Sequence, residues 1–376
     1  MSKKTYFLLA GEPSGDRLGA FLSSGLTAQG HQCVGWGGPK MKAAGTDILH
    51  DMSDLGLMGW SSVITQLPKQ VSLLRKAKED IKKTGADRLI LIDYGSFNLR
   101  IAVWAKQQNI HVIYYSPPKI WASRPKRIRH LKDCDKVIVL FPFEQEYYRS
   151  RGLETVCYGH PLAEDIVNFE PDPSFASRYN LDESPMLGIF PGSRKEEIKT
   201  NLPVYLKAAN KLHKYQVLIS AMPSSQTLIE EVLHQEHMGV PYRLIQHDDY
   251  HNLMRHADIA MITSGTASWE AALHGVPQVV GYRTSQLNYL IAKQLITVPY
   301  ISLVNLMMGR LVVPECIQDE LTTTNLLENI IRLESSETKS EINNSYKNIR
   351  RMSYICLLYT SPSPRDRTRS RMPSSA

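Results

Sequence analysis

The sequence predicts an α/β protein built from two doubly wound, parallel-sheet domains. Short apolar runs alternate with helical patterns along the chain, and three of these runs break into loops of small residues before a helix. Continuous apolar runs are typical of parallel strands that helices cover on both faces. With 376 residues, the chain is long enough for two such domains.

The first domain is expected over residues 1–166. Its strand candidates are 6–10, 88–93, 111–115 and 136–141. A helix should follow the first strand, because apolar residues recur there at helical spacing: Leu18, Phe21, Leu22 and Leu26. Residues 167–185 are polar and contain prolines, and are predicted to form a linker.

The second domain, 186–350, repeats the alternation. Its strand candidates are 186–190, 215–221, 242–247, 258–264 and 277–282. Residues 357–376 are rich in Ser, Pro and Arg and have no periodicity, so they are predicted to be a non-native tail, with a native disordered basic tail as the alternative. The tail carries four Arg and one Asp, a charge of +3, which leaves +4 of the total +7 for the rest of the chain.

This composition indicates a soluble globular protein, with 43% hydrophobic and 22% charged residues. A surplus of +4 fits anionic substrates or an anionic membrane surface, and nucleic acid is not an expected partner. The five cysteines form no CxxC pair, which favours free thiols in a reducing compartment and no metal.

We therefore expect a cytoplasmic protein, because no window reaches the about 18 apolar residues of a spanning helix. An apolar stretch at 55–67 is followed by basic residues: Lys69, Arg75, Lys76 and Lys78. Apolar surface with basic neighbours suits an anionic bilayer, so part of this stretch is predicted to be exposed and to meet a membrane; a buried helix is the alternative.

Two strand-to-helix corners of the second domain have the chemistry of a nucleotide site. Gly192 and Ser193 allow close backbone approach, and Arg194 offers a fork for phosphate oxygens. Ordinary turn and capping chemistry is the alternative for these residues and for Glu197, in the first helical turn. The second corner runs through Ser264, Gly265, Thr266 and Ala267, and Glu270 could accept hydrogen bonds from a ribose.

The first domain carries acids where its strands end. Glu12, Ser14 and Asp16 lie on the corner after the first strand, and Asp93 ends a later one. An acid there is either a reactive group or a cap. Five Arg or Lys residues lie between Lys119 and Arg129, and they form either a phosphate site or a solvated face.

Taken together, these segments resemble the lipid-A-disaccharide synthase family over about residues 5–350. The resemblance is carried, in order, by "AGEPSGDRLGA", "GWGGPKM", "LGLMGW", "IDYGSFNLR", "YYSPPKIWASRPKRI", "YGHPL", "PGSRKEEI", "SGTASWEAAL", "VVGYR" and "SLVNLMMGRLVVPE". It departs from the family pattern at Ser96, Ser123 and Leu311.

The resemblance implies a GT-B fold, two Rossmann-like domains facing a central cleft. It implies an inverting glycosyltransferase that joins UDP-2,3-diacylglucosamine to 2,3-diacylglucosamine 1-phosphate (lipid X), without a metal or other cofactor, at the cytoplasmic face of the inner membrane of Gram-negative bacteria. It allows a homodimer. It also implies that Asp93 is the general base and that the two corners of the second domain bind UDP. Asn305 and Arg310 would belong to an active-site loop.

Three other classes share parts of this pattern. A peptidoglycan-type glycosyltransferase would share the fold and the UDP site, and a UDP-N-acetylglucosamine 2-epimerase would share the fold but isomerise its substrate. A non-enzymatic nucleotide-sugar-binding protein would need no reactive carboxylate, which the acids at Glu12, Asp16 and Asp93 argue against.

Overall fold

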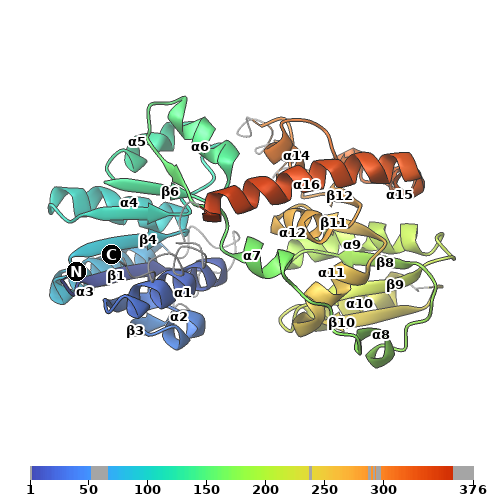
Figure 1. Cartoon of the computed structure of the whole chain (residues 1–376), viewed down its shortest axis with the longest axis horizontal. Helices are drawn as coiled ribbons and strands as arrows, with labels where there is room; N and C mark the ends of the chain where they lie inside the picture. The colour runs from blue at the N-terminus through green and yellow to red at the C-terminus, as the bar shows by residue number, and fades with distance from the viewer. Residues whose placement is uncertain are drawn as a thin grey trace, which may run out of the picture. The chain divides into compact units, whose positions relative to one another are not determined.

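Two parallel β-sheets organise the molecule, one in each of the two units into which the chain divides, Met1–Pro161 and Leu162–Ala376 (Figure 1). The structure, a computed structural model, describes residues 2–51, 67–236, 239–286, 289–290, 293 and 298–358. Each unit has its own sheet and its own covering helices, as the alternating apolar and amphipathic segments predict.

Among the described residues of unit 1, seven parallel strands lie in the order β3-β2-β1-β4-β5-β6-β7. They are β1 Thr5–Ala10, β2 Gln32–Gly37, β3 Thr46–Asp51, β4 Arg88–Ile92, β5 Val112–Tyr115, β6 Lys136–Val139 and β7 Val156–Cys157. The helical segments are α1 Pro13–Ala28, α2 Pro39–Ala43, α3 Leu67–Thr84, α4 Gly95–Gln107, η3 Pro125–Arg127, α5 Ile128–Leu131 and α6 Pro142–Arg149. Leu8 of the central strand pairs with Gly35 on one side and Ile90 on the other.

The described part of unit 2 has six parallel strands in the order β10-β9-β8-β11-β12-β13. They are β8 Met186–Phe190, β9 Gln216–Ala221, β10 Tyr242–Gln246, β11 Ile259–Thr263, β12 Gln278–Tyr282 and β13 Glu315–Ile317. The helical segments are α7 Leu162–Val167, α8 Phe175–Arg178, α9 Lys195–Ala209, α10 Gln226–Glu236, η4 His247–Asp249, α11 Tyr250–His256, α12 Thr266–His274, α14 Leu303–Met308, η5 Gln318–Glu320, α15 Thr323–Glu334 and α16 Ser336–Leu358. In both units the chain steps outward from a central strand and then returns to its other side, which is the doubly wound Rossmann pattern.

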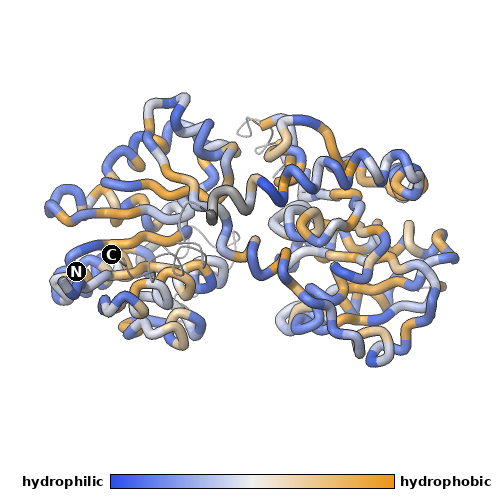
Figure 2. Tube along the Cα trace, in the orientation of Figure 1, coloured by the Kyte–Doolittle hydropathy of each residue, from blue (hydrophilic) through white to orange (hydrophobic). Residues whose placement is uncertain are grey.

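The strands form the two cores, and Figure 2 shows hydrophobic residues concentrated along them. Phe7, Leu8 and Leu9 of β1 have no exposed surface, and neither do Ile259, Ala260 and Met261 of β11. Consecutive buried residues mean that both faces of each sheet are covered. This confirms the interpretation of the continuous apolar runs as buried parallel strands.

Helix α1 packs through a different face from the one that its leucines predict. Leu18 is buried, but Phe21 is 39% exposed, and the buried face also contains Gly15 and Gly19. A Cβ atom on Gly15 would lie 3.2 Å from the Cβ of Ala10, and one on Gly19 would lie 2.5 Å from the sulfur of Met41. Close approach of the helix backbone to the sheet therefore takes precedence over burial of the largest side chain.

Some predicted features fall at the limits of the described residues. Residues 55–66 of the predicted membrane-facing stretch and residues 359–376 of the predicted tail lie outside them. The predicted linker 167–185 includes α8, whose Phe175 is fully buried in the core of unit 2. Helix α16 packs on the same unit, where Tyr346 donates a hydrogen bond to the carbonyl oxygen of Val276.

Candidate functional site

The two predicted nucleotide corners of unit 2 lie next to each other. Strand β8 pairs with β11, with Phe190 opposite Ile262, so the loops that leave these strands emerge at the same edge of the sheet. Gly192 has a φ of +97°, and a Cβ there would lie 2.9 Å from Glu197 Oε2 and 3.3 Å from Thr263 Cγ2. The first corner therefore needs glycine, and it touches the strand that leads into the second.

Arg194 stands at the surface of the first corner. Its side chain is 72% exposed and donates a hydrogen bond from Nη1 to Glu197 Oε1 at 2.7 Å, while the Glu197 side chain is only 10% exposed. Burial and then the charge of Glu197 raise the pKa of neighbouring Tyr282. The guanidinium thus lies over a buried carboxylate at the start of α9, and Ser193 beside it is exposed.

The second corner presents backbone amides. Ser264 is already engaged, because its amide donates to the carbonyl of Gly281 and its hydroxyl to the carbonyl of Ile301 at 2.9 Å. Gly265 is the N-cap of α12 and has no side chain, so the first amides of the helix, beginning with Thr266 and Ala267, receive no side-chain acceptor from the cap. Such amides carry the positive end of the helix dipole and suit an anion.

Glu270 lies one turn into α12 and is held by a residue that the sequence did not single out. The side chain is 6% exposed, and Tyr250 donates a hydrogen bond to its Oε2 at 2.6 Å. Tyr250 in turn packs edge-on against Phe190, with ring centroids 5.5 Å apart. No short-range motif indicates this partnership, because Tyr250 comes from α11, twenty residues earlier in the chain.

In unit 1, Asp93 sits on a strained turn at the end of β4. Asp93 and Tyr94 both have left-handed backbones, with φ of +49° and +51°. Asn98 Nδ2 and Tyr114 Oη donate to the Asp93 carbonyl at 3.0 and 2.9 Å, which holds the turn. Ser14 donates to Asp93 Oδ2 at 2.9 Å, and within the described part of the chain Oδ1 has no partner.

The other two acids of unit 1 differ in their surroundings. Asp16 is 3% exposed, and its carboxylate accepts hydrogen bonds from the amides of Gly38, Lys40 and Met41, at 2.8 to 3.1 Å. It therefore caps α2. Glu12 is exposed at the start of α1, and its charge, after burial, contributes to raising the pKa of Tyr94 to about 12.

Asn305 and Arg310 belong to a loop that the structure holds closed. The buried Asn305 amide donates from Nδ2 to the carbonyl of Val313 and to Glu315 Oε1, and Oδ1 accepts from the amides of Val312 and Val313. Arg310 is exposed and donates from Nη2 to Ser345 Oγ at 2.8 Å. Glu315, which the sequence did not single out, also accepts from the amides of Ile301 and Ser302.

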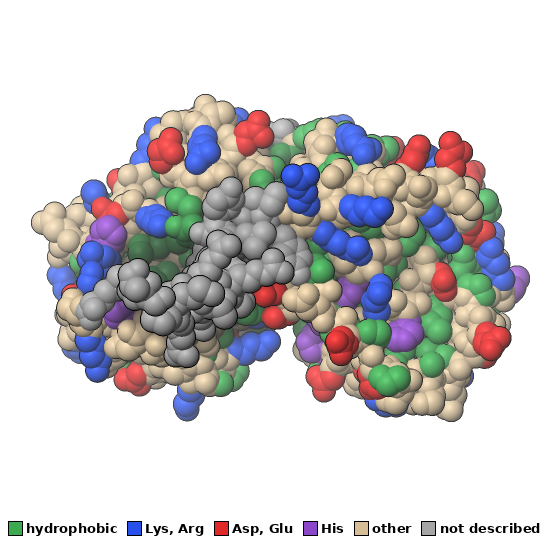
Figure 3. All heavy atoms as spheres, viewed as in Figure 1, with side chains coloured by type: hydrophobic (Ala, Val, Ile, Leu, Met, Phe, Trp, Pro, Cys, Tyr) green, Lys and Arg blue, Asp and Glu red, His purple; other side chains and the backbone are tan. Residues whose placement is uncertain are grey.

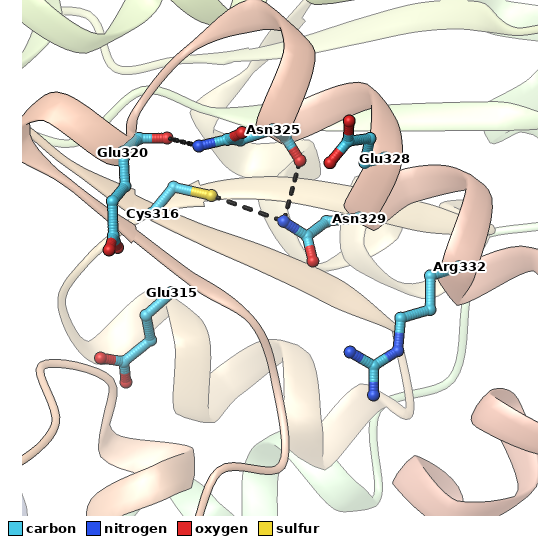
Figure 4. A pocket seen from close by; sticks show the side chains of 7 residues that line it. All are labelled: Glu315, Cys316, Glu320, Asn325, Glu328, Asn329 and Arg332. Carbon is cyan, nitrogen blue, oxygen red and sulfur yellow. Dashed lines mark hydrogen bonds between the residues drawn. The ribbon is translucent and has the colours of Figure 1, made fainter.

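A cavity of about 390 Å³ lies elsewhere on unit 2, between the edge strand β13 and helix α15 (Figure 4). Its lining residues are Glu315, Cys316, Glu320, Asn325, Glu328, Asn329 and Arg332. Three carboxylates face one arginine, which disfavours a phosphate ligand. Burial, with the charge of Glu320, raises the pKa of the Cys316 thiol to about 11, so it is a poor nucleophile.

On the face drawn in Figure 3, Lys and Arg side chains are interspersed with Asp and Glu. Searching the described residues reveals no group of three or more His, Cys, Asp or Glu that could hold a metal ion. In the same residues, no helix combines the length and apolar character that crossing a membrane requires.

Comparison with known proteins agrees with this architecture. The family model described as lipid-A-disaccharide synthetase matches residues 6–354. Lipid-A-disaccharide synthase of Acidobacterium capsulatum is 34% identical over 359 residues, 90% of this chain and 89% of that protein. The Azotobacter vinelandii protein of the same name is 35% identical over 336 residues, 87% of this chain and 88% of its own.

Among solved structures, the similarity is one of fold. A UDP-N-acetylglucosamine 2-epimerase from Listeria monocytogenes matches with a TM-score of 0.61 at 11% identity, over 93% of this chain and 95% of that one. Acinetobacter baumannii MurG gives 0.56 at 15%, over 95% and 99%. A structure of S. aureus MnaA with UDP gives 0.61 at 12%, over 96% and 99%.

Two Rossmann-like units of this kind define the GT-B class, to which many glycosyltransferases belong. The fold alone does not separate transferases from epimerases, but the sequence comparisons do. The chain belongs to the lipid-A-disaccharide synthase family and is a glycosyltransferase of lipid A biosynthesis.

Proposed function

We propose that this enzyme transfers 2,3-diacylglucosamine from UDP to the 6-hydroxyl of 2,3-diacylglucosamine 1-phosphate (lipid X). The products would be a β-1,6-linked disaccharide 1-phosphate and UDP. Family membership supports this reaction, and the residues below give it a chemical basis in this chain.

One observation carries the donor half of the proposal, namely the adjacency of the two corners of unit 2. Arg194 and the corner 264–267 at the start of α12 follow the paired strands β8 and β11, at one edge of the sheet. Such a combination suits a diphosphate, and Glu270, fixed by Tyr250, would accept hydrogen bonds from the ribose hydroxyls. Gly192, Ser193 and Glu197 complete the donor site.

In the proposed reaction, the bond between the anomeric carbon and the diphosphate oxygen breaks while the acceptor oxygen bonds to that carbon. Negative charge grows on the departing UDP, and Arg194 together with the start of α12 would stabilise it. Asp93 Oδ1 would accept the proton of the acceptor hydroxyl, with Oδ2 oriented by Ser14. Glu12 is the next candidate for the base.

The acceptor and donor are acylated, so the enzyme must reach them at a membrane. We propose peripheral attachment to the cytoplasmic face of the inner membrane, through the apolar stretch 55–67 and its basic neighbours. A homodimer is compatible with this role. In the active-site loop, Asn305 would keep the loop closed and Arg310 would stand at its tip.

The experiment that tests the proposal incubates the enzyme with radiolabelled UDP-2,3-diacylglucosamine, with and without lipid X. Product mass spectrometry should show a disaccharide 1-phosphate only when lipid X is present. Label returned as an isomerised UDP-sugar would instead indicate an epimerase. Binding without turnover would contradict an enzymatic role.

A further inference from the structure

Three arginines of unit 1 gather beside the start of helix α4. Arg127 Nη1 donates a hydrogen bond to Ser96 Oγ at 3.3 Å, and Ser96 lies in the first turn of that helix. Arg100 is four residues further along α4, on the same face as Ser96. Arg124 is the N-cap residue of η3 and has a left-handed backbone, with φ of +57°. We call Arg100, Arg124 and Arg127 the arginine cluster.

The positive charge of the arginine cluster is uncompensated. Over the ranges that the structure describes, none of the three guanidiniums forms an ion pair with a carboxylate. They are close enough to affect one another, because burial and then the charges of Arg124 and Arg100 lower the pKa of Arg127. Holding like charges together costs free energy, and an anion between them would offset that cost.

The start of α4 adds donors of the same kind. Tyr94 is the N-cap residue and makes no side-chain capping hydrogen bond, so the first amides of this thirteen-residue helix have no side-chain acceptor from the cap. These amides, the guanidiniums and the Ser96 hydroxyl are all hydrogen-bond donors. A doubly charged ligand with several acceptor oxygens matches such a set better than a carboxylate or a neutral sugar does.

We propose that the arginine cluster and the start of α4 form the site that holds the 1-phosphate of the acceptor sugar. Arg124 and Arg127 would bind its oxygens as forks, and Arg100 would add charge from the helix face. This assignment rests on the proposed function, because it takes lipid X as the acceptor.

The position of the cluster fits the chemistry of the acceptor. Asp93 lies in the turn after β4, and Ser96 follows it by three residues, in the first turn of α4. In lipid X the 1-phosphate and the reactive 6-hydroxyl are carried by one pyranose ring. A phosphate held at the cluster would therefore bring the reactive hydroxyl to the same corner of unit 1 as Asp93, the carboxylate proposed as its base.

The test compares lipid X with its dephosphorylated counterpart, 2,3-diacylglucosamine, in detergent micelles. Binding is measured without donor, and transfer is measured with donor. The variants are Arg127→Gln, Arg124→Gln and the double variant, with Arg127→Lys as the conservative change. Arg88→Gln is the matched control, because it removes the same charge at the amino edge of the same sheet. Melting temperatures verify that each variant is folded.

We expect Arg127→Gln to raise KM and Kd for lipid X about 10–100-fold, the range for losing one or two charge-assisted hydrogen bonds, while KM for the donor stays unchanged. Arg127→Lys should retain part of the affinity, and Arg88→Gln all of it. The double variant should lose most of the preference for the phosphorylated acceptor. A preference that survives in the folded double variant would overturn the assignment.

Phospholipid headgroups also carry phosphate, so a second arm measures sedimentation with vesicles containing phosphatidylglycerol. The double variant should sediment like the wild type. Reduced sedimentation together with an intact preference for lipid X would assign the cluster to the bilayer and overturn the proposal. If the wild type binds lipid X through the cluster but transfers no sugar, the proposed function fails and the phosphate site stands.

Discussion

At the scale of single residues, Asp93 shows how hydrogen bonding holds a strained backbone turn in place. Two successive left-handed residues without glycine are costly, and they persist here because Asn98 and Tyr114 hold the Asp93 carbonyl. Burial, and then the charge of Asp93, raise the pKa of Tyr114, which keeps that phenol protonated as a donor. The result is a carboxylate with one oriented oxygen and one open oxygen.

We predict that Asp93→Asn lowers kcat about 10²–10⁴-fold, the usual loss when a general base is removed. An amide keeps the shape and can still accept from Ser14, but it cannot take up the proton. UDP affinity, measured by calorimetry, should not change. Arg194→Ala serves as the opposite control, because it should weaken UDP binding about 10-fold or more. Near-normal turnover of Asp93→Asn would move the base to Glu12.

A second residue-scale prediction concerns Gly11, which allows Tyr94 to lie against the β1 corner. A Cβ on Gly11 would lie 2.3 Å from the Tyr94 ring, and that ring is buried. Gly11→Ala must therefore displace the ring, and we expect a loss of about 1–3 kcal/mol in the free energy of unfolding by urea. When Tyr94 is also replaced by Ala, the Gly11→Ala change should lower the free energy of unfolding much less. Equal costs in both backgrounds would show that the ring is not the cause.

At the scale of elements, the predicted strands with long apolar runs are those that the structure contains. β8 is identical to the predicted run 186–190, and β4, β9 and β11 lie within theirs. The sequence pattern does not predict β2 and β3, because Gly35 and Gly37 interrupt the first apolar run and polar residues interrupt the second. β7 and β13 are two and three residues long, too short to give a periodic signal.

The sequence predicts the candidate site only where its residues are close together in the chain. Corners such as 192–194 and 264–267 are contiguous in sequence, so their glycines and small residues could be recognised. The partners that hold the other candidate residues come from distant elements: Tyr250 of α11 holds Glu270, Glu315 of β13 holds Asn305, and Asn98 of α4 holds the Asp93 carbonyl. Sequence spacing carries no information on such contacts until the strand order is known.

Asp16 links two elements, because a side chain of α1 caps α2. We predict that Asp16→Asn lowers the free energy of unfolding by about 1–3 kcal/mol, since the amide nitrogen would face backbone N–H groups that now have an acceptor. In the folded variant, kcat should be close to that of the wild type. Urea titration and assays well below the melting temperature separate the two effects. A large loss of kcat at unchanged stability would instead place Asp16 among the catalytic groups.

At the scale of the whole molecule, each unit contains a buried histidine that is held neutral. Burial, followed by the charges of Arg17 and Lys119, lowers the pKa of His160 in unit 1 to about 3. In unit 2, burial and then His251 lower the pKa of His274 to about 3. The ordinary value is about 6.5, so between these limits the unfolded chain binds protons that the folded chain does not.

Stability should therefore fall as the pH is lowered from about 6.5 toward 3. Each histidine should contribute about 1–2 kcal/mol of the loss between pH 6.5 and 5, because the unfolded state takes up the proton first. Urea unfolding followed at several pH values measures the slope. His160→Gln and His274→Gln should each make the dependence shallower. An unchanged slope in both variants would show that other groups set the acid limit.

The shared strand order gives the two sheets equivalent positions. β1 corresponds to β8, and β4 corresponds to β11, since each pair occupies the same place in its order. The corner with Glu12 and Ser14 is thus the topological counterpart of the corner with Ser193 and Arg194. The same scaffold thus carries opposite charge at matching positions, the Glu12 carboxylate in unit 1 and the Arg194 guanidinium in unit 2. Exchanging these two loops would therefore reverse the charge at that corner in either unit while leaving the sheet and its helices unchanged.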